Sequence, residues 1–153
     1  MMTTATVLGL VALGVLAISA ISKLVLYSMK GPLEDRIAAR YEPDEILMKD
    51  LKANSFGLES RGVWQARGNG GLVLTASSLH FFQFLPQSDL RIPLDAISEL
   101  TIVKSHLGKA TIYDLLKVHF STEGKNDSIA WYLTDPKAWI ARIESLQGRQ
   151  PTN

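Results

Sequence analysis

The glycine-rich segment GNGG, residues 68–71, is the stretch most suggestive of chemistry, because backbone amides in such segments can hold phosphate. A phosphate-binding loop follows a strand and opens a helix, whereas here the β-type residues LVLT come next. The chain contains neither the GxxxxGKS/T nor the GxGxxG pattern. Asn69-Gly70 is instead typical of a type I′ hairpin turn. We therefore predict a turn between two strands and no nucleotide site.

The remaining reactive side chains form no local constellation. His80, His106 and His119 are far apart and lack the HxxxH or HExxH spacing of metal ligands. No GxSxG nucleophile motif occurs. The acid pairs at 34–35 and 44–45 fall at expected helix starts or turns, where acids are common. The sequence predicts no catalytic residue, no metal, no cofactor and no enzyme activity.

The composition indicates one ordinary folded domain, with 46% hydrophobic and 20% charged residues over 153 positions. Lys23 and Lys30 are the basic residues before Gly31, so 14 of the 16 basic residues and all 15 acidic residues follow. This balance gives no basic footprint for nucleic acid. The absence of Cys excludes a disulfide framework and a thiol nucleophile, and it fits a cytoplasmic domain without proving one.

The N-terminal segment has the composition of a membrane span. Residues 5–22 form an 18-residue run without charge, about 27 Å long as a helix against a hydrocarbon core of ~30 Å. Lys23, Tyr27 and Lys30 would then lie at the lipid interface as anchors. We predict a retained anchor over residues 1–30. A cleaved signal peptide is disfavoured, because a basic start is missing and the run exceeds ~7–15 residues.

No basic residue precedes this predicted span, and four follow it: Lys23, Lys30, Arg36 and Arg40. The positive-inside rule then predicts a single-pass protein of the inner or plasma membrane, with its N-terminus outside and its C-terminal domain in the cytoplasm. Small residues share one helical face, namely Ala5, Gly9, Ala12 and Ser19. This face either packs against a partner helix or reflects the usual abundance of small residues in spans.

A break at Gly31-Pro32 is predicted to separate the span from a short second helix within residues 31–43. Leu33, Ile37 and Tyr41 are spaced to share one face of that helix. The helix would lie either on the membrane surface or on the following domain, and amphipathicity serves both arrangements.

Residues 44–147 read as a run of strands and one closing helix. Period-two alternation from Leu116 to Phe120 predicts half-buried antiparallel strands, and the regular spacing of the runs favours a sandwich or barrel. The candidate strands are ILMKDLKANSF, LVLT, LHFFQF, LRIPL, ISELTIV, DLLKVHF and SIAWYL, with a turn at residues 76–78.

Asp135-Pro136 is a strong helix start, and Gly148 is a natural stop. The apolar stripe of this helix comprises Trp139, Ile140, Ile143 and Leu146. We expect it to cover the open end of a small barrel, followed by a loose tail over residues 148–153.

Four stretches resemble the bacterial pleckstrin-homology-like and GRAM-like families: GLVLTASSLHFF, RIPLDAISEL, LLKVHF and DPKAWIARIESL. The resemblance covers residues 45–146. It implies a strongly bent antiparallel barrel or sandwich of about seven strands, capped by the C-terminal helix. The predicted fold class is thus α+β, mainly β, preceded by a transmembrane helix. Domains of this kind bind lipids, peptides or proteins, or serve as scaffolds.

Two surfaces are candidates for binding. Lys104, His106 and Lys109 lie close together and could contact anionic lipid headgroups. A solvated hairpin loop is the favoured interpretation, because three residues are fewer than the usual 4–8. Phe82 and Phe84 face away from the predicted core, so they form either a partner surface or a surface that another segment covers.

These features favour a non-catalytic, single-pass accessory subunit. Its domain would dock on a larger integral-membrane complex, such as a respiratory or photosynthetic assembly, and membrane lipids would be its other partner. The alternative hypothesis is a membrane-tethered module that binds anionic phospholipid.

Overall fold

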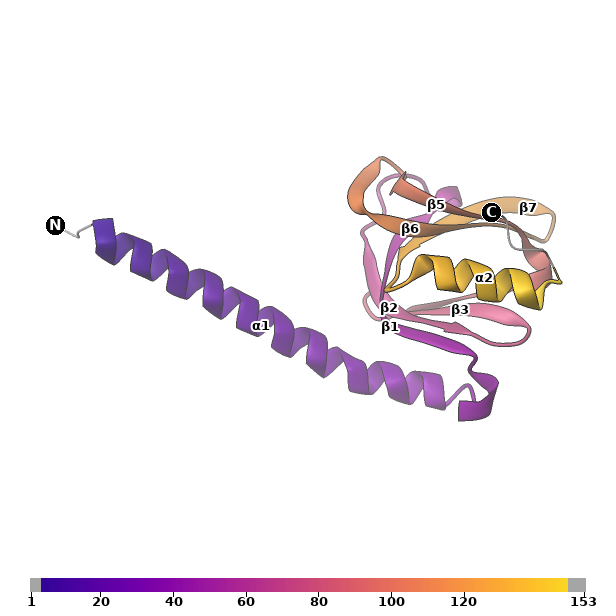
Figure 1. Ribbon diagram of the computed structural model, residues 1–153, viewed down its shortest axis with the longest axis horizontal. Coiled ribbons are helices and arrows are strands. Elements are labelled where there is room, and N and C mark those ends of the chain that lie inside the picture. The colour runs from indigo at the N-terminus through magenta and orange to yellow at the C-terminus, as the bar shows by residue number, and fades with distance from the viewer. Residues whose placement is uncertain (1–3, 149–153) are drawn as a thin grey trace.

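The computed structural model describes the backbone of residues 4–148 and, within that range, side chains other than those of residues 4–7, 22–23 and 25–30. Figure 1 shows a long N-terminal helix that projects from a compact β-rich domain. The predicted tail falls almost wholly outside the described residues.

One antiparallel sheet of seven strands forms the domain, in the order β4-β3-β2-β1-β7-β6-β5. Its strands are β1 (Met48–Leu58), β2 (Gly68–Leu74), β3 (Ser78–Gln83), β4 (Ser88–Pro93), β5 (Ile97–His106), β6 (Lys109–Thr122) and β7 (Lys125–Tyr132). Short 3-10 turns occur at Pro43–Glu45, Glu59–Arg61 and Leu94–Ala96. β1 is central and pairs with β2 and β7, with irregular register at two points where bulges bend it.

The bent sheet encloses the main core on its inner face. Leu72 and Leu79 from one half of the sheet join Leu116 and Trp131 from the other half, and all are fully buried. The rings of Phe81 and Trp131 lie 5.8 Å apart, which places β3 opposite β7. The alternating apolar residues of each strand therefore meet in a single interior.

Helix α2 (Pro136–Leu146) covers this core and contacts β5 and β6. Its start is as predicted, because the Asp135 carboxylate accepts a hydrogen bond from the Ala138 amide at 3.0 Å. Trp139 and Ile143 are buried against the sheet. The predicted closing helix is therefore confirmed, with the same bounds to within one residue.

The prediction of a hairpin turn at Asn69-Gly70 is wrong. Both residues lie inside β2, where Asn69 is opposite Asn54 and Gly70 is opposite Ala53 and Gln83. Glycine is needed at position 70 because a Cβ there would lie 2.2 Å from the carbonyl oxygen of the neighbouring strand. The two-residue hairpin turns occur instead at residues 107–108 and 123–124, where both backbones have positive φ.

Helix α1 runs without interruption over Thr4–Ala38, with Pro32 inside it. The predicted break at Gly31-Pro32 is therefore wrong, and the segments on either side of it form one element. Leu33 and Ile37 at its C-terminal end are buried on the outer face of the sheet, so this end lies on the domain. The sequence had left open whether this helical segment lies on the membrane surface or on the following domain, and the structure shows the second arrangement.

The predicted transmembrane helix is wrong. Within the part of the chain that the structure describes, no helix combines the length and apolar composition that crossing a membrane requires. The apolar stretch is one end of a helix whose other end carries charges and packs on the sheet. The fold class is thus corrected to a seven-stranded antiparallel sheet with helices, and the single-pass topology and the inner or plasma membrane localisation are withdrawn with the span.

Candidate functional site

A second hydrophobic cluster and a pocket lie where α1 meets the outer face of the sheet. We define the outer cluster as the buried residues Leu33, Ile37, Tyr41, Val73 and Phe82, which pack together there. The sheet supplies two of them, and α1 with the turn after it supplies three. The i, i+4 spacing of Leu33 and Ile37 places both on the face of α1 that meets the sheet. The outer cluster fixes the end of α1 on the domain.

Polar contacts reinforce the outer cluster. Arg36 donates a hydrogen bond to the Gln83 carbonyl at 2.9 Å and pairs with Asp89. The Tyr41 hydroxyl lies 2.8 Å from His80 Nδ1, and the His80 ring stacks on Phe82 with centroids 3.9 Å apart. Burial lowers the pKa of His80 to about 4, so the ring is neutral at pH 7.

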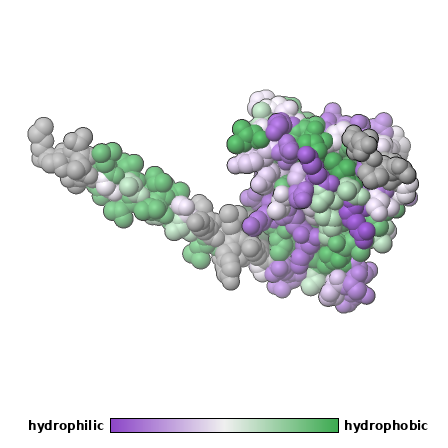
Figure 2. Space-filling model, viewed as in Figure 1, coloured by the Kyte–Doolittle hydropathy of each residue, from purple (hydrophilic) through white to green (hydrophobic). Residues whose placement is uncertain are grey.

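Beyond this cluster, α1 presents apolar side chains to its surroundings (Figure 2, green). Nine of them are between 56% and 68% exposed, namely Leu8, Leu10, Val11, Leu13, Val15, Leu16, Ile18, Ile21 and Leu24. At about 100° per residue these positions point in all directions around the helix axis. A helix that is apolar all round is normally buried in a larger structure.

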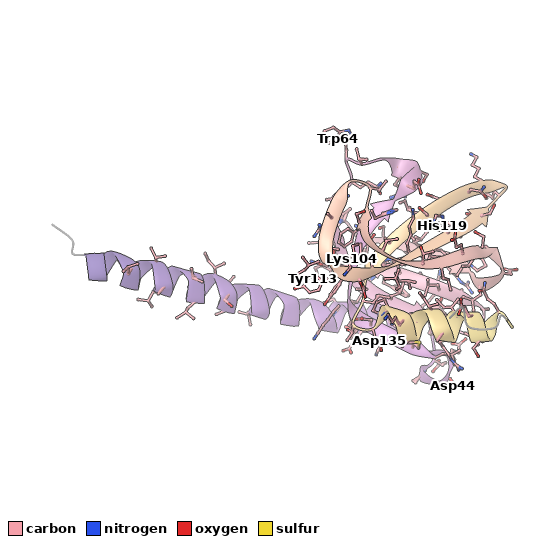
Figure 3. All side chains as sticks on the ribbon, turned by 45° about the horizontal axis from the view of Figure 1, so that its top comes forward. Asp44, Trp64, Lys104, Tyr113, His119 and Asp135 are labelled. Carbon is pink, nitrogen blue, oxygen red and sulfur yellow. The ribbon has the colours of Figure 1, made fainter. Side chains whose placement is uncertain are left out.

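A pocket of about 490 Å³ opens beside the outer cluster, between the end of α1 and strands β1, β2, β6 and β7. Its wall is largely apolar and includes Leu33 of α1, Phe56, Phe84, Tyr113 and Tyr132. The rings of Tyr113 and Tyr132 lie 5.1 Å apart. Figure 3 shows Tyr113 on the side of the domain from which α1 projects.

Two basic side chains, Lys52 and Arg67, also line the pocket. The Arg67 guanidinium lies 4.2 Å from the centroid of the Phe56 ring. Asn54 donates a hydrogen bond to Asn69 across the β1–β2 pair. The pocket therefore joins an aromatic surface to a positively charged rim.

The predicted lipid-contact residues are brought together by the β5–β6 hairpin but are engaged within the protein. Lys109 Nζ donates to the carbonyls of Phe56 at 3.0 Å and Gln65 at 2.6 Å. His106 is buried with Nε2 2.9 Å from the Gly57 carbonyl, and burial lowers its pKa. Lys104 pairs with Asp114 at 3.1 Å. These contacts hold the loop after β1 against the hairpin, and the binding of lipid headgroups by these residues stays a prediction.

The other predicted binding residues lie in the outer cluster, in the pocket wall and on α1. Phe82 is buried in the outer cluster, whereas Phe84 is half-buried and lines the pocket. Gly9, Ala12 and Ser19 are exposed on α1. The side chains of Ala5 and of the predicted interface anchors Lys23, Tyr27 and Lys30 lie outside the described residues.

The three histidines are not brought together. His80 lies in β3 beneath α1, His106 is the last residue of β5, and His119 lies on β6. The described residues hold no group of three His, Cys, Asp or Glu side chains placed to bind a metal ion. The pocket was missed from the sequence, although Asn54 and Phe56 at alternate positions of β1 indicate a shared face once that strand is known.

No family model matches the chain. No curated protein matches it. Among solved structures, the chain is similar to the C-terminal domain of an unknown protein from Leishmania infantum, with 16% sequence identity and a TM-score of 0.49 over 68% of this chain and 84% of that one.

Proposed function

We propose that the protein is a non-catalytic accessory subunit that docks on a larger protein assembly through the exposed half of α1. The observation that carries this proposal is the set of apolar side chains between Leu8 and Ile21, all more than half exposed. Exposed apolar surface of this extent on a single element marks an interaction site.

The distribution of these side chains indicates the kind of partner. Leu13, Val15 and Leu16 point in different directions around the helix, so a single flat contact covers only some of them. We infer that the partner supplies several apolar helices around α1, one of which packs closely on the face that carries Gly9, Ala12 and Ser19. The docked C-terminal end of α1 then positions the β domain against that assembly.

We also propose that the domain belongs with the pleckstrin-homology-like and GRAM-like families. Seven antiparallel strands followed by one C-terminal helix support this proposal. Such a domain suits an accessory role, because domains of this kind bind other molecules or serve as scaffolds without catalysis.

The test uses a matched pair of substitutions on α1, Gly9→Leu and Gly14→Leu. A Cβ at either position meets nothing within 4 Å, so neither change disturbs a contact within the described structure. The two positions lie about 140° apart around the helix, and Gly9 shares its face with Ala12 and Ser19. Close packing of helices depends on the size of the side chains at the contact, so only the Gly9 change should block it.

The tagged full chain is isolated gently from its native cells, and its size and stoichiometric partners are measured. We expect the unaltered chain and Gly14→Leu to co-elute with one large assembly and Gly9→Leu to elute without it. Isolation of the unaltered chain alone, or equal behaviour of the two variants, would contradict docking through this face. Ile112→Glu serves as a second control, because Ile112 is 81% exposed but lies on β6.

A further inference from the structure

We propose that the pocket beside α1 binds a small aromatic carboxylate, with its ring system against the aromatic wall and its anionic group on Lys52 and Arg67. This inference concerns a ligand site and does not depend on whether the exposed half of α1 docks on a larger assembly. A volume of about 490 Å³ lies in the range of pockets for small molecules, which are usually apolar with a few polar groups that fix orientation.

The wall of the pocket favours a flat, apolar body. Phe56, Tyr113 and Tyr132 come from three different strands and meet at this one site. Aromatic rings gain from offset or edge-to-face contact with another ring, beyond the burial of apolar area. An aromatic ligand therefore uses the wall better than an alkyl chain of equal area.

Charge selects an anion. Among the described residues that line the pocket, two are basic and none is Asp or Glu. Neither Lys52 nor Arg67 forms a salt bridge with another described residue, in contrast to Lys49 and Lys104, which pair with Glu34 and Asp114. The cations at the pocket are thus available to a ligand without breaking such a pair.

The position of Arg67 suits recognition of a carboxylate. Its guanidinium lies over the Phe56 ring, and a guanidinium in such a position can donate hydrogen bonds from the N–H groups at its edge. A planar guanidinium can donate two parallel bonds to a carboxylate, and Lys52 can add a third charged donor. A ring held next to Phe56 would bring its carboxylate within reach of this edge.

The test compares 2-naphthoate with its uncharged counterpart 2-naphthamide, using NMR spectra of the ¹⁵N-labelled full chain. The two probes share one ring system and differ in charge. We expect saturable shifts of the Asn54, Phe56 and Tyr132 amide signals with naphthoate. The amide should bind about tenfold more weakly, because hydrogen bonds to charged groups are worth about that factor or more.

The double variant Lys52→Gln/Arg67→Gln should lower naphthoate affinity to the level of naphthamide and leave naphthamide affinity unchanged. Both residues are exposed, so the fold should persist, and the spectra report it directly. Lys49→Gln/Arg61→Gln is the matched control, because it removes the same charge at positions that do not line the pocket. Arg67→Lys, which keeps the charge but loses the planar fork, should lower naphthoate affinity by less than the double variant does.

Three results would overturn the proposal. The first is the absence of saturable shifts at the pocket amides with either probe. The second is equal affinity for naphthoate and naphthamide, which would leave an apolar cavity without anion recognition. The third is an equal loss of naphthoate affinity in the control double variant, which would show that only the overall charge matters.

Discussion

Lowering the pH from 8 to 5 should cost the protein about 2 kcal/mol of unfolding free energy through His80 alone. The His80 side chain is 1% exposed, and burial lowers its pKa from 6.5 to about 4. The unfolded chain takes up a proton at His80 near pH 6.5, whereas the folded protein does so only near pH 4. The stability is therefore fully present above pH 6.5 and falls as the pH decreases towards 4.

The magnitude follows from the two pKa values. A shift of this size corresponds to about 3 kcal/mol in total at 1.36 kcal/mol per pKa unit, of which about 2 kcal/mol is lost by pH 5. The charges that act on the ring are one carboxylate, which opposes the shift, and three guanidinium groups, which add to it. They are Asp89, Arg36, Arg40 and Arg91.

Urea unfolding between pH 8 and pH 5 measures this effect in two chains, Tyr41→Phe and Tyr41→Phe/His80→Phe. The shared Tyr41 change removes the hydroxyl that would otherwise lose its partner at His80 Nδ1. We expect the chain with His80 to lose about 2 kcal/mol more than the chain without it. The other titrating groups, His106 among them, are present in both chains and cancel. Parallel stability curves would refute a neutral, buried His80.

Four further substitutions test other parts of the structure. Gly70→Ala should destabilise the domain by about 3 kcal/mol in urea unfolding, because its Cβ would lie 2.2 Å from the Phe82 carbonyl oxygen. Gly71→Ala should cost clearly less, because its Cβ meets only side-chain atoms at 3.2 Å or more, and equal losses would count against the β2–β3 register. Asp135→Ala should lower thermal stability by about 1 kcal/mol through loss of the α2 N-cap, and an unchanged melting temperature would contradict that cap. Lys109→Met should speed hydrogen exchange in residues 62–67, because it removes two hydrogen bonds to backbone carbonyls, and unchanged exchange would show that they do not hold this loop.

The elements encoded by local patterns were predictable. Alternation from Leu116 to Phe120 identified β6, and Asp135-Pro136 with Gly148 identified α2, because strand period and helix capping depend on near neighbours. The turn at residues 76–78 was also predictable and is closed by the Thr75 amide bonded to the Ser78 carbonyl. These signals lie within a few residues of the structure that they predict.

Where distant partners decide the structure, the local pattern is not sufficient. Asn69-Gly70 has the local preference of a turn, but pairing with β1 and β3 on both sides holds it extended in the sheet. Lys109 lies a few residues after Lys104 and His106 in the sequence, and its ammonium group is bonded to carbonyls 44 and 53 residues away. Neither outcome is visible in the residues around these positions.

The course of α1 depends on a similar balance. Proline inside a helix is unfavourable by about 3 kcal/mol relative to alanine, which made Pro32 a natural boundary. Leu33 and Ile37, which follow Pro32, are buried against the sheet. Burial of each side chain of this size contributes about 1.5–3 kcal/mol to stability. The helical geometry that places both side chains on the sheet therefore offsets the local penalty, and continuity through Pro32 follows.

This continuity gives Leu33 two roles. Leu33 is buried in the outer cluster that fixes α1 to the sheet, and it also forms part of the pocket wall. A ligand in the pocket would thus contact the docked end of the helix whose other end is exposed. A ligand that binds only when the end of α1 is packed on the sheet stabilises that arrangement by mass action. Occupation of the pocket should therefore hold α1 against the domain. The proposed ligand site and the proposed docking helix would then be linked through one side chain.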